Sequence, residues 1–219
     1  MGEWGPFKFG DVRVKPGSRE QAEIDLGDDP MGNPMNIPLH IIHGSERGPT
    51  LVVTAAIHGN EMNGTGIIHQ LAFGSDHQAG TTDDHIDPEA MSGTLILVPV
   101  VNVEGMLLQH RNAPDGRDIN RLFPGKKNGN QSQRLAHTLF DLVVRRADYL
   151  IDLHTAARGR TNPLTWSLPN LLAYFKSESS CSGIGLFGRF LFFGVFHLCL
   201  TFCRRFSVLG LDLLQPLLF

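Results

Sequence analysis

The chain of 219 residues has no cysteine before residue 181. A disulfide framework or a CxxC zinc motif is therefore excluded for most of its length. Strong charge of one sign is also missing, because the formal net charge is −3, so nothing in the balance favours nucleic acid as a partner. The N-terminal stretch MGEWGPFKFGDVRVK has no basic start followed by an apolar segment, which gives no indication of a secretory signal. We therefore expect a reducing, cytoplasmic location and no nucleic-acid partner.

Charged residues become scarce after Asn162. Only four of the 19 Lys and Arg residues and two of the 22 Asp and Glu residues lie beyond it, and all three cysteines lie there too. A continuous enzyme domain seldom changes composition so sharply. We therefore expect residues 1–162 to form one α/β domain and residues 163–219 to form an apolar tail of different character.

The first part alternates apolar runs with amphipathic segments. Helical spacing predicts helices over residues 62–73 and 132–147, and the charged segment 74–88 predicts a surface loop. The first two of the predicted strands are expected to be neighbours joined by the turn GSERGP. This alternation predicts a mixed, largely parallel sheet with helices on both faces. The predicted strands are residues 36–43, 50–57, 94–101 and 149–153.

Two histidines follow predicted strands directly. His58 ends the run TLVVTAAI, Glu61 comes three residues later, and His154 ends the strand YLIDL. Ligands of such sheets bind beyond the carboxyl ends of the strands. Two imidazoles and one carboxylate are a common catalytic zinc set, and Gly59 is expected to relieve crowding beside the metal. An HxxE pattern alone is often accidental, but the matching strand ends favour a metal site.

The segment RNAPDGRDINRLFPG, residues 111–125, is rich in turn residues and arginines. One interpretation is a solvated loop with a turn at Pro114. A functional interpretation is also open, because the adjacent Asn120 and Arg121 can bind a carboxylate through a two-pronged guanidinium. A further arginine nearby, Arg111 or Arg117, can polarise a scissile carbonyl.

Taken together, HGNE, RNAPDGRDINRLFPG and IDLHTAARGRTN resemble the succinylglutamate desuccinylase/aspartoacylase family across about residues 28–162. Members of this family are zinc-dependent deacylases with a carboxypeptidase-like α/β fold. The resemblance implies that His58, Glu61 and His154 hold one zinc ion. A structural role and a role in orienting a zinc ligand are equally open for Asp152.

The same resemblance implies roles for the residues of the loop. Asn120 and Arg121 match the family's pair that holds the substrate's carboxylate. Arg111 matches the arginine that polarises the carbonyl, with Arg117 as the competing candidate. The implied reaction is hydrolysis of the amide or ester bond of an N-acyl amino acid or similar small substrate. The alternatives are a zinc carboxypeptidase and a metal-binding remnant without catalysis.

The chain departs from the family pattern after His154. The family uses a glutamate on a late strand as general base, and the carboxylates that follow His154 are Glu178 and Asp212. Neither has the matching context, so the role is transferred to neither. We therefore expect a C-terminally truncated domain and impaired catalysis.

Three interpretations of the tail remain. The favoured one is a truncated coding region followed by an alternative or frame-shifted sequence. Another is a membrane anchor over residues 183–203, which are long and apolar enough to span a bilayer. Arg189 and His197 inside that segment argue against it. The third is a core element of a divergent domain.

Overall fold

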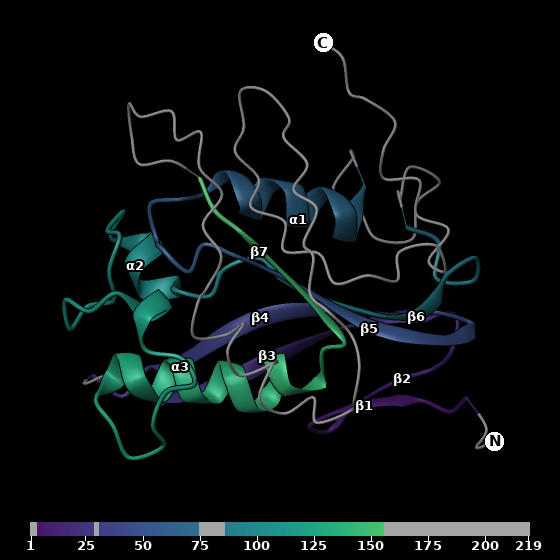
Figure 1. Cartoon of the computed structure of the whole chain (residues 1–219), viewed down its shortest axis with the longest axis horizontal. Helices are drawn as coiled ribbons and strands as arrows, with labels where there is room; N and C mark the ends of the chain where they lie inside the picture. Colours follow the sequence, from purple (N-terminus) through teal and green to yellow (C-terminus); the bar gives the residue numbers. More distant parts are fainter. Residues whose placement is uncertain (1–3, 29–30, 75–85, 156–219) are drawn as a thin grey trace, which may run out of the picture.

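The computed structural model describes residues 4–28, 31–74 and 86–155 (Figure 1). The predicted loop over 74–88 lies largely outside these residues, and the tail with its candidate span 183–203 lies entirely outside them. Among the helices of the described residues, none is long and apolar enough to cross a membrane.

Five strands form one sheet in the order β3-β4-β6-β5-β7. Strands β6, β5 and β7 run parallel, whereas β4 is antiparallel to both β3 and β6, so the sheet is mixed as expected. Strands β1 and β2 form a separate two-stranded sheet. The bounds of the strands are β1 (Phe7–Phe9), β2 (Val12–Val14), β3 (Ser18–Asp28), β4 (Pro34–His43), β5 (Glu46–Ala55), β6 (Ser92–Val98) and β7 (Tyr149–Leu153).

The expectation that the strands now seen as β4 and β5 are neighbours is wrong, because β6 lies between them. Every residue of β6 from Gly93 to Val98 is buried, as suits a strand with both faces covered and partners on both edges. Part of the predicted turn GSERGP belongs to β5, which begins at Glu46. Turn residues alone did not reveal that a later strand inserts between these two.

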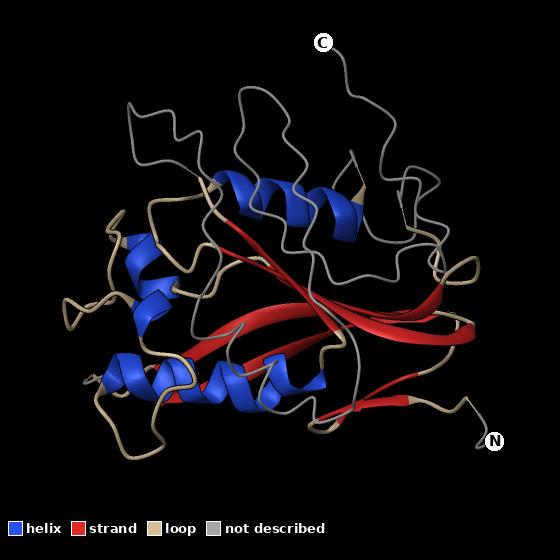
Figure 2. Cartoon of the chain, viewed as in Figure 1, coloured by secondary structure: helices blue, strands red, loops and turns tan. Residues whose placement is uncertain are grey.

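Helices cover both faces of the sheet (Figure 2). Helix α1 (Asn63–Phe73) lies on one face and α3 (Gln131–Leu142) on the other. The predicted helix over 132–147 ends earlier, at Leu142, and a 3₁₀ turn η2 (Val144–Arg146) follows. Two shorter elements, α2 (Val103–Leu107) and the 3₁₀ turn η1 (Ile119–Arg121), precede α3.

The two faces bury separate cores, and β5 contributes to both. Val52 packs in the core on the α3 side, while Leu51 and Val53 pack in the core with Ile68 of α1. Successive side chains of a strand point to opposite faces, so a strand covered on both sides must be apolar throughout. This explains the nearly unbroken apolar run TLVVTAAI.

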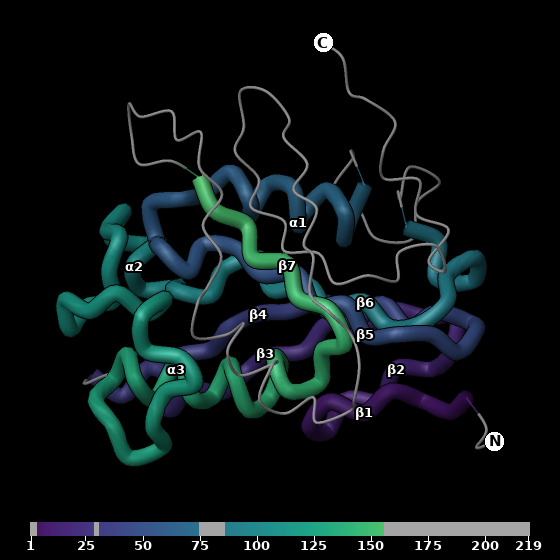
Figure 3. Tube along the Cα trace, viewed as in Figure 1, coloured from purple at the N-terminus to yellow at the C-terminus, as the bar shows by residue number. Residues whose placement is uncertain are grey.

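Strand β7 lies beside β5, although the two are far apart in the sequence (Figure 3). Their parallel register pairs Ala55 with Leu153, the last residue of each strand. The chain therefore leaves both strands at the same edge of the sheet. The predicted metal ligands follow these two strand ends.

Candidate metal centre

His58, Glu61 and His154 meet at the edge where β5 and β7 end. One ligand atom from each residue lies within 4.8 Å of the others. His58 and Glu61 are buried, and the side chain of His154 is 19% exposed. The structure thus brings together all three ligands predicted from the sequence.

Both imidazole rings turn their Nδ1 atoms toward the Glu61 carboxylate. Nδ1 of His154 lies 2.9 Å from Glu61 Oε2, and Nδ1 of His58 lies 2.9 Å from Glu61 Oε1. The second contact does not have hydrogen-bond geometry, so His58 Nδ1 is a buried nitrogen without a hydrogen-bond partner among the described residues. Two imidazole nitrogens and a carboxylate facing one point are a donor set that zinc accepts. The residues present therefore fit a zinc ion.

The outer nitrogen of each ring contacts a second carboxylate. His58 Nε2 lies 3.1 Å from Asp118 Oδ1, and His154 Nε2 lies 2.8 Å from Asp152 Oδ2. Asp152 is itself held by the hydroxyl of Thr54, which donates to Oδ1 over 2.7 Å. A metal-binding histidine commonly donates its other N–H to such a carboxylate, which fixes the tautomer and the ring orientation. Without a metal, His154 Nδ1 donates its N–H to Glu61 Oε2; the same nitrogen would have to lose that proton to bind an ion.

Asp118 is the functional candidate that the sequence patterns did not single out. It forms the N-cap of η1 and accepts a hydrogen bond from Asn120 N over 3.1 Å. Its second oxygen accepts from Arg121 Nε over 3.4 Å. The sequence signal that could have indicated it is its position two residues before the Asn120–Arg121 pair. In the structure, the turn at Asp118 brings its carboxylate into contact with both this pair and His58.

The charges of the site stabilise one another. Burial by itself lowers the pKa of His154, but the nearby Asp152 and Glu61 carboxylates outweigh it and raise the pKa to about 10. Burial by itself raises the pKa of Glu61, but the hydrogen bond from His154 and the charge interactions with both histidines bring that pKa well below its ordinary value. Glu61 is therefore an ionised carboxylate, the form that binds a metal.

The structure brings Arg111 to this cluster and leaves Arg117 outside it. Arg111 Nη1 donates to Glu61 Oε1 over 2.6 Å, and its Nη2 lies 3.9 Å from Asp118 Oδ2. Arg117 pairs instead with Asp115, at 3.4 Å. Of the two competing arginines, Arg111 alone is thus seen at the candidate metal site among the described contacts.

Asn120 and Arg121 lie beside the cluster, held there through Asp118. The side chain of Arg121 is 83% exposed, so its guanidinium faces solvent. The Oδ1 atom of Asn120 is buried without a hydrogen-bond partner among the described residues. These positions agree with a carboxylate-binding pair at the rim of the site, a role that stays a prediction.

The turn between β5 and Glu61 depends on a close approach of two backbones. A Cβ atom added at Gly59 would lie 2.0 Å from the carbonyl carbon of Gly105 in α2. The crowding that requires glycine thus comes from α2, whereas we expected it to come from the metal. Three residues before Gly59, Ala56 has φ +49°, an uncommon value for a residue other than glycine, and its carbonyl accepts from Asn102 N over 3.0 Å.

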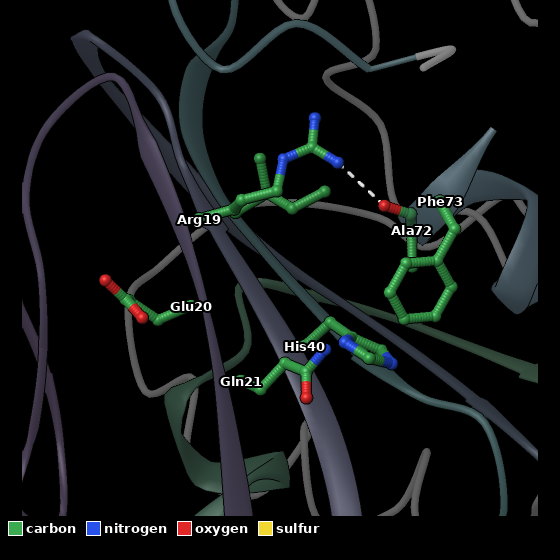
Figure 4. A pocket seen from close by; sticks show the side chains of 7 residues that line it. Arg19, Glu20, Gln21, His40, Ala72 and Phe73 are labelled. Carbon is green, nitrogen blue, oxygen red and sulfur yellow. Dashed lines mark hydrogen bonds between the residues drawn. The ribbon is translucent and has the colours of Figure 1, made fainter. Parts of the chain in front are cut away.

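A hollow of about 350 Å³ lies apart from the metal site, over β3 and β4 near the end of α1 (Figure 4). Arg19 donates to the carbonyls of Ala72 and Ile86 across its upper side, at 2.7 and 2.5 Å. His40 packs edge-on against Phe73 inside it. Burial, with the nearby His69 and Arg19, lowers the pKa of His40 to about 4, so this ring is neutral.

A comparison with known families gives a match over residues 47–189 to the "Succinylglutamate desuccinylase/Aspartoacylase catalytic domain". The match passes the boundary expected at Asn162. Because residues 156–219 lie outside the described part, that boundary stays a prediction.

A curated relative is the N-alpha-acetyl-L-2,4-diaminobutyric acid deacetylase of Halomonas elongata. It is 28% identical over 123 residues, which cover 56% of this chain and 32% of the relative. This chain therefore spans about a third of that protein's length.

Solved structures with the same fold include a succinylglutamate desuccinylase/aspartoacylase from Rhodobacter sphaeroides. It has a TM-score of 0.56 and 30% identity, over 69% of this chain and 42% of that one. Another is the product-bound ectoine utilization protein EutE (DoeB) from Ruegeria pomeroyi, with a TM-score of 0.55 and 26% identity, over 69% and 43% of the two chains. The described residues thus correspond to less than half of each solved relative.

Proposed function

Because the chain belongs to the succinylglutamate desuccinylase/aspartoacylase family, we propose that it is a zinc-dependent deacylase. Its substrate would be an N-acyl amino acid or a similar small molecule with a hydrolysable amide or ester bond. The observation that carries this proposal is the convergence of His58, Glu61 and His154, with ligand atoms within 4.8 Å of one another. The relative from Halomonas elongata, named as a deacetylase of an acetylated amino acid, supports the substrate class.

Three residues would bind the metal, and two carboxylates would orient the histidines among them. His58 Nδ1, His154 Nδ1 and a Glu61 oxygen would hold the zinc ion. When bound, zinc lowers the pKa of water to about 7 and polarises a carbonyl oxygen. With the ion bound, Asp118 and Asp152 would each accept the Nε2–H of one ring and so leave Nδ1 for the ion.

Arginines at the rim supply the remaining charge. Arg121 with Asn120 would fix the carboxylate of an amino-acid substrate, because a guanidinium binds a carboxylate through two parallel hydrogen bonds. Arg111, the arginine nearest Glu61, would stabilise negative charge that develops on the carbonyl oxygen. In this proposal Asn120 and Arg121 would bind the substrate's carboxylate, and Arg111 would supply positive charge beside the reacting bond.

We also propose that the 219-residue chain catalyses this hydrolysis weakly. A general base must be within reach of a water and have a free oxygen to take its proton. Besides Glu61, the carboxylates that contact the metal-site histidines among the described residues are Asp118 and Asp152, and each is already paired with an imidazole. Glu178 and Asp212, the carboxylates that follow His154, lie outside the described residues.

The test uses the purified full chain with and without added Zn²⁺. We expect it to bind zinc weakly, to release acid slowly from N-acetyl and N-succinyl amino acids, and to leave short peptides uncleaved. His58→Ala should abolish both zinc binding and the slow hydrolysis. A wild-type chain that binds no zinc would contradict the proposal, and preferential cleavage of peptides would favour a carboxypeptidase instead. Rapid zinc-dependent turnover would contradict only the proposed impairment.

A further inference from the structure

We propose that Arg111 competes with the metal ion for Glu61 and thereby sets the affinity of the site for metal. This inference rests on the proposed zinc site and goes beyond it, because the family resemblance assigns Arg111 to the substrate alone. The observation behind it is the ion pair between Arg111 Nη1 and Glu61 Oε1, at 2.6 Å.

The two oxygens of Glu61 have different surroundings. Oε2 accepts from Thr155 N over 3.1 Å and lies 2.9 Å from His154 Nδ1. Oε1 is shared by Arg111 and by His58 Nδ1, the nitrogen that lacks a hydrogen-bond partner among the described residues. A guanidinium on Oε1 and a divalent cation between Oε1 and His58 would carry charge of the same sign a few ångströms apart.

An alternative role for the same contact is to orient Glu61 for the metal. The surroundings of Oε2 argue against a need for this, because the backbone N–H of Thr155 and the ring of His154 already fix that side of the carboxylate. Glu61 is also buried, which limits its rotation further. The net effect of Arg111 on metal binding is therefore set by its charge.

Arg111 has a second carboxylate within reach. Its Nη2 lies 3.9 Å from Asp118 Oδ2, and its side chain is 45% exposed. Arg111 can therefore move away from Glu61 without displacing buried side chains. When the ion occupies Oε1, Arg111 keeps Asp118 as a partner and its Nη1 becomes available to a substrate. Metal binding and the readiness of Arg111 for the substrate are thus coupled.

The experiment measures the affinity of the full chain for Zn²⁺ by competition with a chelating indicator. Arg111→Gln should bind zinc about tenfold more tightly than wild type, because a lost charge-assisted contact is worth about that factor. Arg111→Lys, which retains the charge, should bind with an affinity between the two. Circular dichroism checks that each variant is folded.

Arg117→Gln is the matched control. Arg117 lies on the same loop, carries the same charge and has similar exposure, but it pairs with Asp115. Its removal should change zinc affinity by less than about twofold, because exposed pairs contribute little. Equal or weaker zinc binding by Arg111→Gln would overturn the inference while leaving the zinc site intact. Failure of wild type and all variants to bind zinc would overturn the proposed function as well.

Discussion

Two pairs of histidines in this molecule have opposite surroundings. His58 and His154, at the ends of β5 and β7, have a carboxylate within 3.1 Å of each ring nitrogen. His43, on β4, has Thr94 Oγ1 at 2.9 Å and the Gly5 carbonyl at 3.1 Å as ring partners. His40, also on β4, has His69 and Arg19 as its titratable neighbours.

The difference decides what each pair can do. Carboxylates hold both rings of the first pair in fixed orientation and attract a cation between them. The second pair is kept neutral: burial lowers the pKa of His43, partly opposed by its bond to Gly5, and the pKa of His40 falls to about 4. The acids around His58 and His154 thus make these two histidines candidates for metal ligands, while the β4 histidines serve packing and hydrogen bonding.

Removing a ligand should give the largest effect. Glu61→Gln keeps the shape of the side chain but removes the charge that both ligand histidines face, and zinc affinity should fall by at least about 100-fold. The matched change on the other pair, His40→Gln, should leave zinc affinity unaltered. Isothermal titration of both variants with Zn²⁺ makes the comparison. Similar losses in the two variants would remove the distinction between the pairs.

Neutralising the supporting acids should give the next largest effect. Asp118→Asn and Asp152→Asn each leave one ligand ring without its carboxylate, and we expect zinc to bind roughly 10- to 100-fold more weakly. Asp141→Asn is the control, because Asp141 forms an exposed pair with Arg145 away from the site. If Asp118→Asn behaved like Asp141→Asn in the same titration, Asp118 would have no part in orienting His58.

The smallest expected effect is the change in folding stability with pH that His40, one of the two β4 histidines, causes. His40 has a folded pKa of about 4, below its ordinary value of 6.5, so its proton is taken up more readily by the unfolded chain. Its contribution to stability is fully present above pH 6.5 and is lost as the pH falls toward 4. Allowing for solvent screening of a partly exposed ring, the loss should be about 1–2 kcal/mol.

Urea unfolding of the metal-free chain at several pH values measures this effect. His40→Gln should flatten the decline in unfolding free energy between pH 6.5 and 4. An unchanged decline in the variant would show that another group carries it. The comparison is made against wild type under the same conditions, which cancels contributions from the other acidic groups.

Local patterns were sufficient to predict the two strands that lead to the site and the three side chains that meet there. The apolar run before His58 and the strand YLIDL before His154 each lead to a candidate ligand, and the parallel pairing of β5 and β7 brings their ends together. The position of β6 between β4 and β5 was not predictable in this way, because strand order depends on pairing between distant segments. Strand β3 was not predicted, although its buried Ala22 and Ile24 alternate with polar neighbours, a period-2 pattern that is typical of a strand.

Side-chain partnerships were the least predictable feature. The sequence indicated that either Arg111 or Arg117 lies at the site. The turn residues of their loop are compatible with either arginine at that position. The structure separates them through the backbone: the Arg111 carbonyl accepts from Gly59 N over 3.3 Å, which places Arg111 beside the turn that carries Glu61. The contact of Asp118 with His58 was not predictable for a similar reason, since a carboxylate in a turn usually serves as a cap.

The most direct test of the central claim is X-ray absorption at the zinc edge of the zinc-loaded full chain. Convergence of His58, Glu61 and His154 on one ion predicts nitrogen and oxygen neighbours at about 2.0–2.2 Å, with the outer-shell signature of two imidazoles. A sulfur shell at about 2.3 Å would place the ion on the cysteines of the tail, Cys181, Cys199 and Cys203, and would contradict the account.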